Sequence, residues 1–185
     1  MPSPLHILRE RTAAAHRQLE LAHLHNGEAT RAGYVALLRG SLAAVHAIEP
    51  VVTRWLPAAA RPSRVASLRR DLAELGERDD VEPIAVQLAD DPATAWGAAY
   101  VVEGSTLGGV VLAQQFERAL APAERGATSY LRLRGAGTAA HWRAFVQALE
   151  QAPLVDHALE RAVQAAVLSF GAYHRAFLHH QVIAA

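Results

Sequence analysis

The chain of 185 residues contains no cysteine and no lysine. The absence of cysteine excludes disulfides, iron–sulfur clusters, thiolate metal ligands and cysteine nucleophiles, so histidine must do any metal binding. The absence of lysine leaves 18 arginines to balance 18 acidic residues. This balance argues against a polybasic arm, and we expect neither nucleic-acid binding nor attachment to a membrane surface.

Long apolar runs are also missing. No stretch approaches the roughly 20 apolar residues that span a bilayer, and the N-terminal residues lack the charged and apolar regions of a signal peptide. We therefore expect a cytoplasmic protein without a membrane segment. Half of the residues are hydrophobic, which is enough to bury a core, and the length fits a single domain over residues 1–185.

Apolar residues recur at helical spacing almost throughout, and no alternating run reaches convincing strand length. The sequence therefore predicts an all-α fold. We expect Gly40 to interrupt one helix and residues 122–137 to form an irregular connection. Capping residues and helix breakers place the expected helices at residues 3–22, 30–56, 63–75 and 91–120, with two more that begin at residues 138 and 153.

Three glycines, Gly104, Gly108 and Gly109, stand inside the expected helix of residues 91–120, within the stretch YVVEGSTLGG that begins at Tyr100. Each glycine costs a helix interior about 1 kcal/mol relative to alanine, so together they give up roughly 3 kcal/mol of local stability. Two explanations are open. The glycines can form a small-residue face for close helix packing, or they can let the backbone approach a flat ligand.

His16 lies in the first expected helix, where a lone histidine is more often a core or surface residue than a ligand. Its neighbours favour a ligand. Glu20 follows four residues later on the same face, where its carboxylate can accept the proton of one ring nitrogen and leave the other nitrogen for a metal. Arg9 lies two turns earlier on the same stripe, where it could pair with a carboxylate of the ligand. A solvated charged face would look similar.

The two segments fit together as the two sides of one site. One offers a nitrogen ligand on a helix, and the other offers a helix face without side chains. A flat ligand with a metal at its centre needs both, and the simplest such ligand is haem with its iron.

Both segments resemble those of the haem oxygenases, in particular the soluble bacterial enzymes associated with bacteriophytochromes. The similarity lies in the histidine with its i+4 glutamate, and in the tyrosine-led Gly-x-x-x-Gly-Gly helix about 90 residues later. A weaker third segment is HWRAF at residues 141–145. The resemblance implies a helical fold that sandwiches haem between a proximal helix and a kinked distal helix.

By this resemblance, His16 is the proximal iron ligand, Glu20 orients it, and Gly104 and Gly108 lie over the haem. Ser105 stands where the eukaryotic enzymes have an aspartate, so we expect the distal water to be held differently. The resemblance also brings to the site Gly109, the distal-side Tyr100, and two basic residues for the haem propionates, Arg9 and Arg143.

The resemblance also implies a reaction in which haem is both substrate and cofactor. O2 and external electrons would open the ring to biliverdin and release CO and ferrous iron. The chain has no Gly-x-Gly-x-x-Gly fingerprint for a nucleotide of its own, so we expect a ferredoxin or a reductase as electron donor. A bacteriophytochrome is the expected candidate to receive the biliverdin.

Two alternatives belong to other functional classes. A haem-binding carrier or sensor would share the site and lack only the turnover. A helical protein of similar architecture that degrades thiamin usually needs a nucleophilic cysteine, which this chain does not have.

Overall fold

The computed structural model describes residues 3–24 and 29–183, and over these ranges the chain forms helices and no strands. This confirms the predicted all-α fold. Two short 3₁₀ helices, η1 (Pro122–Glu124) and η2 (Gly135–Gly137), lie in the connection that we expected to be irregular. The α-helices are α1 (Pro4–Leu24), α2 (Arg31–Trp55), α3 (Arg64–Glu74), α4 (Pro92–Ala119), α5 (Thr138–Gln151) and α6 (Asp156–Ile183).

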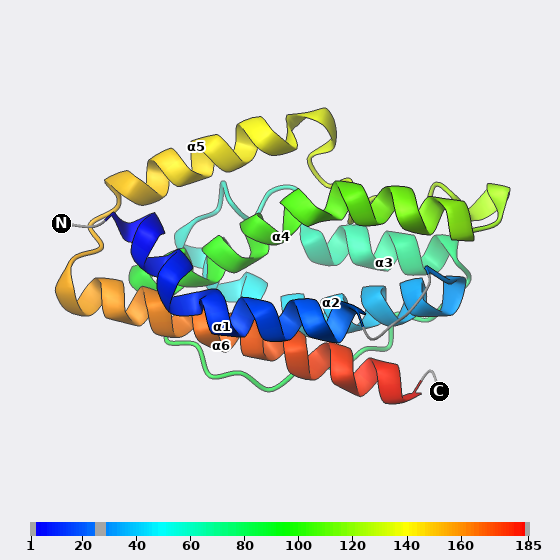
Figure 1. Ribbon diagram of the computed structural model, residues 1–185, viewed down its shortest axis with the longest axis horizontal. Coiled ribbons are helices and arrows are strands. Elements are labelled where there is room, and N and C mark those ends of the chain that lie inside the picture. Colours follow the sequence, from blue (N-terminus) through cyan, green and yellow to red (C-terminus); the bar gives the residue numbers. More distant parts are fainter. Residues whose placement is uncertain (1–2, 25–28, 184–185) are drawn as a thin grey trace.

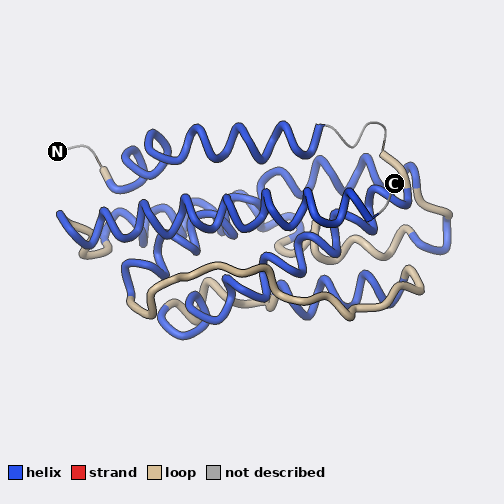
Figure 2. Tube along the Cα trace, turned by 90° about the horizontal axis from the view of Figure 1, so that it is seen from below, coloured by secondary structure: helices blue, strands red, loops and turns tan. Residues whose placement is uncertain are grey.

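Helix α6 is the central element of the packing, because it contacts α1, α2 and α4. In Figure 1, α1 and α6 run side by side, α4 lies above them, and α5 crosses the top. Helix α3 packs against α2. The long loop between α3 and α4 runs along the outside of the helices (Figure 2), and its Ile84 N–H donates a hydrogen bond to the Ala43 carbonyl.

Helix α2 is long and apolar enough to cross a membrane by length and composition alone, although 72% of its most apolar window is buried inside the protein. Tyr34, Leu38 and Leu42 on this helix are fully buried. Its apolar residues therefore form the core of the fold, where α4 and α6 also pack.

The sequence signals for helix starts are confirmed at three places. Thr30 caps α2, Ser63 caps α3 by accepting a hydrogen bond from the Ala66 N–H at 3.3 Å, and Asp91 caps α4. Helix α3 ends beside Gly76, whose φ of 73° lies in the left-handed region that favours glycine. These signals are local, so they are readable without the rest of the fold.

Two expectations about the helices are wrong. Gly40 does not interrupt α2, which runs through it; a Cβ at this position would lie 2.6 Å from the Phe177 ring, so the glycine makes room for α6. The last helix begins at Asp156 rather than at Pro153. Leu154 before it is buried, and its N–H donates to the Ala152 carbonyl, so this segment forms a turn that seals the core.

A second close approach brings α4 and α6 together near the start of α4. A Cβ on Gly97 would lie 1.9 Å from the Ala162 carbonyl oxygen, so no other residue fits there without separating the two helices. This crossing holds the first turns of α4 against α6, while the later turns reach the cavity described below.

The N-cap of α4 leads to a prediction about pH. Burial raises the pKa of Asp91, but hydrogen bonds from the Thr94 N–H and hydroxyl, together with Arg161, outweigh it and lower the pKa overall. The ionised carboxylate therefore stabilises the fold above its unfolded-state pKa, and this contribution is lost as pH falls through the folded-state pKa. We expect Asp91→Ala to lower the free energy of unfolding by about 1 kcal/mol at pH 7.

Urea unfolding at a series of pH values measures this contribution. The difference between wild type and Asp91→Ala should persist down to about pH 4 and shrink below it, as pH falls through the lowered folded-state pKa. Asp91→Asn, which keeps the cap without the charge, should cost less at neutral pH. A cost of Asp91→Ala that does not change with pH would contradict the assignment.

Candidate active site

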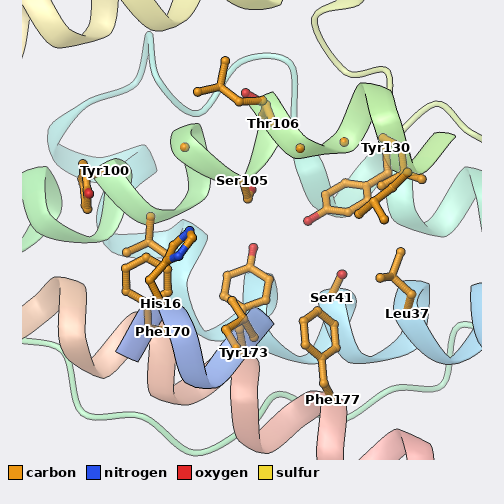
Figure 3. A pocket seen from close by; sticks show the side chains of 18 of the residues that line it. His16, Leu37, Ser41, Tyr100, Ser105, Thr106, Tyr130, Phe170, Tyr173 and Phe177 are labelled. Carbon is orange, nitrogen blue, oxygen red and sulfur yellow. The ribbon is translucent and has the colours of Figure 1, made fainter. Parts of the chain in front are cut away.

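Helices α1, α2, α4 and α6 surround a cavity of about 360 Å³, which is within the range of roughly 300–1,000 Å³ for small-molecule sites (Figure 3). Most of its lining is apolar, with a few hydroxyl groups and one imidazole. Such a lining offers apolar surface for a ligand and a small number of polar atoms to orient it.

The imidazole of His16 enters the cavity from α1. It is solvent-accessible, and the Phe170 ring from α6 meets it edge-on, with the ring centroids 5.5 Å apart and the planes at 81°. This contact restrains the plane of the imidazole. The side chain of Glu20 lies outside the described residues, so its expected role in orienting His16 stays a prediction.

The three glycines of α4 also line the cavity, and each meets different surroundings. A Cβ on Gly109 would lie 2.6 Å from the Leu131 carbonyl oxygen, so this glycine is required for packing. A Cβ on Gly104 would make an ordinary contact of 3.7 Å with Trp142, whereas a Cβ on Gly108 would meet no atom within 4 Å. Gly108 is therefore the position where the protein keeps space free on the cavity side of the helix.

The helix is locally irregular where these glycines lie. The Ser105 hydroxyl donates to the Val102 carbonyl at 2.9 Å, and the Thr106 hydroxyl donates to the Glu103 carbonyl at 2.6 Å. Side-chain bonds of this kind and glycine–serine pairs are recognised causes of helix bending. Figure 1 shows that α4 changes direction along its length.

Two tyrosines that the sequence analysis did not single out, Tyr130 and Tyr173, point into the cavity (Figure 3). Tyr173 on α6 is 3% exposed, and its hydroxyl has no hydrogen-bond partner within the described part of the chain. Burial, and then the neighbouring Tyr130 phenol, raise the pKa of Tyr173 well above its ordinary value. Tyr173 therefore stays a neutral hydroxyl that is able to donate to a ligand.

A sequence signal for Tyr173 does exist. Phe170, Tyr173 and Phe177 are spaced by three and four residues, so they share one face of α6. Such spacing is typical of a core stripe, and only the polar atom of Tyr173 distinguishes this stripe from one.

Tyr130 is positioned by a carboxylate outside the cavity. Asp71 on α3 accepts hydrogen bonds from the Tyr130 N–H at 2.8 Å, the Ser129 N–H at 2.9 Å and the Ser129 hydroxyl at 2.5 Å. Tyr34 on α2 donates its hydroxyl to the Ala127 carbonyl at 2.6 Å. The loop that forms this wall is thus attached to α2 and α3.

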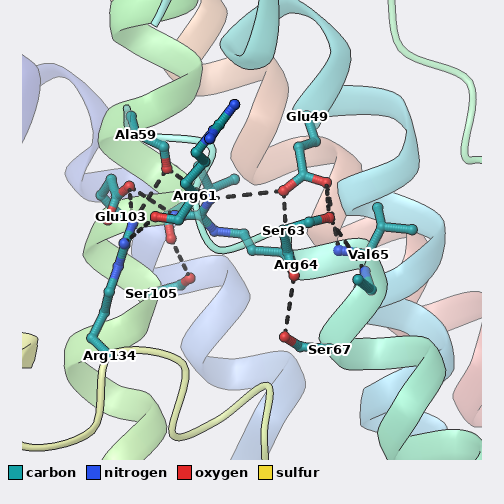
Figure 4. A network of polar contacts seen from close by, with 12 residues as sticks. Glu49, Ala59, Arg61, Ser63, Arg64, Val65, Ser67, Glu103, Ser105 and Arg134 are labelled. Atoms are coloured by element: carbon teal, nitrogen blue, oxygen red, sulfur yellow. Dashed lines mark hydrogen bonds and ion pairs between the residues drawn. The ribbon is translucent and has the colours of Figure 1, made fainter. Parts of the chain in front are cut away.

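A buried charge network lies on α4 beside the first glycine (Figure 4). The Glu103 carboxylate is fully buried and lies 2.9 Å from each of Arg64, Arg134 and His141. A second carboxylate, Glu49 on α2, accepts from the Arg64 N–H at 2.9 Å. The sequence analysis missed this network, although Glu103 is the charged residue in an otherwise small and apolar stretch.

The remaining predicted residues fall into two groups. Tyr100 and Ser105 line the cavity, and Ser105 points into it. The Tyr100 ring lies 6.2 Å from Trp142. Arg9 and Arg143 are solvent-exposed and are not among the lining residues, so their pairing with a ligand carboxylate stays a prediction.

This geometry fits haem in two respects. One nitrogen ligand is what the iron requires from the protein below the macrocycle, and His16 offers one. The open space at Gly108 and the unsatisfied Tyr173 hydroxyl are features that a bound ligand would occupy and satisfy. Over the described ranges, no three His, Cys, Asp or Glu side chains form a cluster able to hold a bare metal ion.

The family model described as Heme oxygenase matches residues 5–179, which is nearly the whole chain. The protein belongs to the haem oxygenase family. Among curated members, the heme oxygenase of Xanthomonas campestris pv. campestris (strain 8004) is 36% identical over 111 residues, which are 60% of this chain and 65% of that protein. The matched segment thus spans just under two thirds of that relative.

A solved haem oxygenase structure confirms the fold. The NO- and CO-bound heme oxygenase from Neisseria meningitidis matches with a TM-score of 0.77 and 24% identity, over 97% of this chain and 92% of that chain. The predicted helical fold of this family is therefore present from α1 to α6.

The glycines of this haem oxygenase family member allow a test that separates packing from ligand space. We expect Gly108→Ala to raise the free energy of unfolding of the haem-free protein by up to about 1 kcal/mol, because alanine favours the helix and its Cβ meets no protein atom. The same substitution should weaken haem binding, because the new methyl group occupies the ligand space. Urea unfolding and a spectroscopic haem titration measure the two effects.

Gly109→Ala is the matched control, because its Cβ would collide with the Leu131 carbonyl. This variant should be less stable than wild type by about 1–3 kcal/mol even without haem. If Gly108→Ala binds haem as tightly as wild type, Gly108 does not face the ligand.

Proposed function

We propose that the protein is a haem oxygenase that converts haem to biliverdin, CO and ferrous iron, with O2 and electrons from a separate donor. The observation that supports this most directly is the pairing of His16 with the open backbone of Gly108 across one largely apolar cavity. Family membership over residues 5–179 supports the same reaction. When bound, haem would supply the iron centre for O2 and the ring that is oxidised.

The chain's own residues would hold and orient this substrate. His16 binds the iron through a ring nitrogen, and Phe170 keeps its imidazole plane in place. On the opposite side, the backbone at Gly104 and Gly108 would lie against the macrocycle, because glycine has no side chain to intervene. With His16 below the macrocycle and a bare backbone above it, the upper face of the iron would be left to a small molecule.

The hydroxyl groups would place water and protons on the α4 side of the cavity. The Ser105 hydroxyl donates a hydrogen bond to the Val102 carbonyl, so its oxygen is left to accept a hydrogen bond from water in the cavity. Tyr173 is neutral and buried, so it donates into the same space. Tyr100 and Tyr130 add two more hydroxyls at the cavity wall.

The finer assignments belong to this proposal as well. Glu20 orients His16, Gly109 contributes to the backbone over the macrocycle, and Arg9 and Arg143 pair with the haem propionates from the exposed faces of α1 and α5. The electron donor is a ferredoxin or a reductase, the biliverdin passes to a bacteriophytochrome, and the protein works in the cytoplasm. Resemblance to the soluble bacterial enzymes supports these assignments.

Replacement of the iron ligand tests the site. We expect His16→Ala to lower haem affinity by more than the roughly 10–100-fold that loss of a residue supporting a metal ligand costs, because it removes the ligand itself. The Soret band of the complex should move, and added imidazole should restore it. An unchanged Soret maximum and an unchanged ferrous–CO spectrum in His16→Ala would exclude this ligand.

Turnover separates an oxygenase from a carrier or sensor. Haem-loaded wild-type protein, given a reductant in air, should lose its Soret band and form biliverdin. A complex that binds haem through His16 and stays spectrally unchanged under these conditions would be a carrier or sensor.

The arginines should affect how haem is seated. A guanidinium binds a carboxylate through two parallel hydrogen bonds, which fixes the in-plane rotation of the macrocycle and so the carbon that is attacked. We expect Arg9→Ala and Arg143→Ala to change the ratio of biliverdin isomers while the His16 ligation stays intact. Chromatography of the isomers measures this, and ratios equal to wild type in both variants would remove the orienting role.

A further inference from the structure

We propose that Glu103 is a positioning residue that fixes α4 at the glycines facing the ligand. The inference rests on the proposed function of the cavity as a haem site. Glu103 immediately precedes Gly104, and successive residues of a helix are turned by about 100° around its axis. Gly104 lines the cavity and Glu103 does not, so the carboxylate extends away from the ligand face.

Three separate elements contact this one carboxylate. Arg64 comes from the start of α3, Arg134 from the loop before η2, and His141 from α5, each at 2.9 Å (Figure 4). Arg134 also donates to the Ala59 and Arg61 carbonyls, so it is itself held in place. Rotation or translation of α4 at Glu103 would therefore break polar contacts with all three elements.

The helix needs such an anchor at this point. Glycine in a helix interior weakens it, and three glycines lie among the six residues from Gly104 to Gly109. The Ser105 and Thr106 hydroxyls, moreover, bond to carbonyls of α4 itself. Interactions within the helix alone would therefore not fix the distance of this backbone segment from the cavity.

Stability alone is a weak reason for this network. Removing charges from water opposes folding, and apolar residues of similar volume often stabilise a protein as well as a buried ion pair does. Burial lowers the pKa of Arg134 despite its contact with Glu103, which reflects this cost. A network that contributes little stability, yet holds α4 from three sides beside the ligand face, is suited to positioning.

Amide hydrogen exchange of the haem-free, full-length protein tests the anchor directly. We expect Glu103→Gln to increase the exchange of amides 104–109 by about tenfold, which is the effect of losing one charge-assisted hydrogen bond. Glu49→Gln is the matched control. It removes a buried carboxylate from the same network, but Glu49 lies on α2 and contacts Arg64 and Ser63 rather than α4.

Vibrational spectroscopy of the haem-loaded protein complements the hydrogen-exchange measurement. In the ferrous–CO complex, the C–O stretching frequency reports the polar surroundings above the iron. It should shift or broaden in Glu103→Gln and stay at the wild-type value in Glu49→Gln. His141→Gln removes one partly exposed partner of Glu103 and should give a smaller shift in the same direction, which keeps the test valid if Glu103→Gln does not fold.

The outcomes separate this inference from the proposed function. If wild-type protein binds no haem, the proposed function fails, and exchange of amides 104–109 still measures the anchor. If haem binds, but Glu103→Gln and Glu49→Gln give the same exchange at matched global stability and the same stretching frequency, Glu103 has only a structural role. Larger changes in Glu103→Gln and His141→Gln than in Glu49→Gln support positioning.

Discussion

One constraint governs the site: α4 must be bare where it faces the cavity and firmly held everywhere else. The bare face requires glycine at 108, where the protein leaves open space, and this weakens the helix. Three contacts at different positions along α4 fix the helix to the rest of the protein. Gly97 lies against the α6 backbone, Gly109 lies against the Leu131 carbonyl, and Glu103 contacts basic side chains from α3, α5 and the loop before η2. Glycine therefore has two opposite uses in one helix.

This double use explains which glycines could be interpreted from the sequence. The sequence analysis left packing and ligand contact as alternatives for the whole group, and the structure shows different surroundings for its members. Gly109 is a packing glycine, and Gly108 is the one that leaves space. Nothing in the sequence around them distinguishes the two, because the deciding atom belongs to Leu131, more than 20 residues away. Gly40 was misread for the same reason, since its neighbour Phe177 is on the last helix.

The parts that could be predicted are those that depend on short stretches of chain. The helix caps at Thr30, Ser63 and Asp91 and the cavity positions of His16 and Gly108 follow from spacing within a few residues or from the family pattern. The parts that could not be predicted are made by convergence of distant segments. No local sequence pattern predicts that Arg64, Arg134 and His141 contact Glu103. Likewise, a tyrosine between two phenylalanines on α6 looks like core until the fold shows where its hydroxyl points.

The wall of the cavity around Tyr130 is a loop, and side chains from α2 and α3 hold its main chain. Asp71 accepts from the backbone of residues 129 and 130, and Tyr34 donates to the Ala127 carbonyl. Because these bonds are made to main-chain atoms, they do not depend on which side chain the loop carries at residue 130. Replacing Asp71 or Tyr34 alters the path of the loop directly. Among related sequences, we therefore expect position 130, which lines the cavity, to vary more than positions 71 and 34, which do not line it.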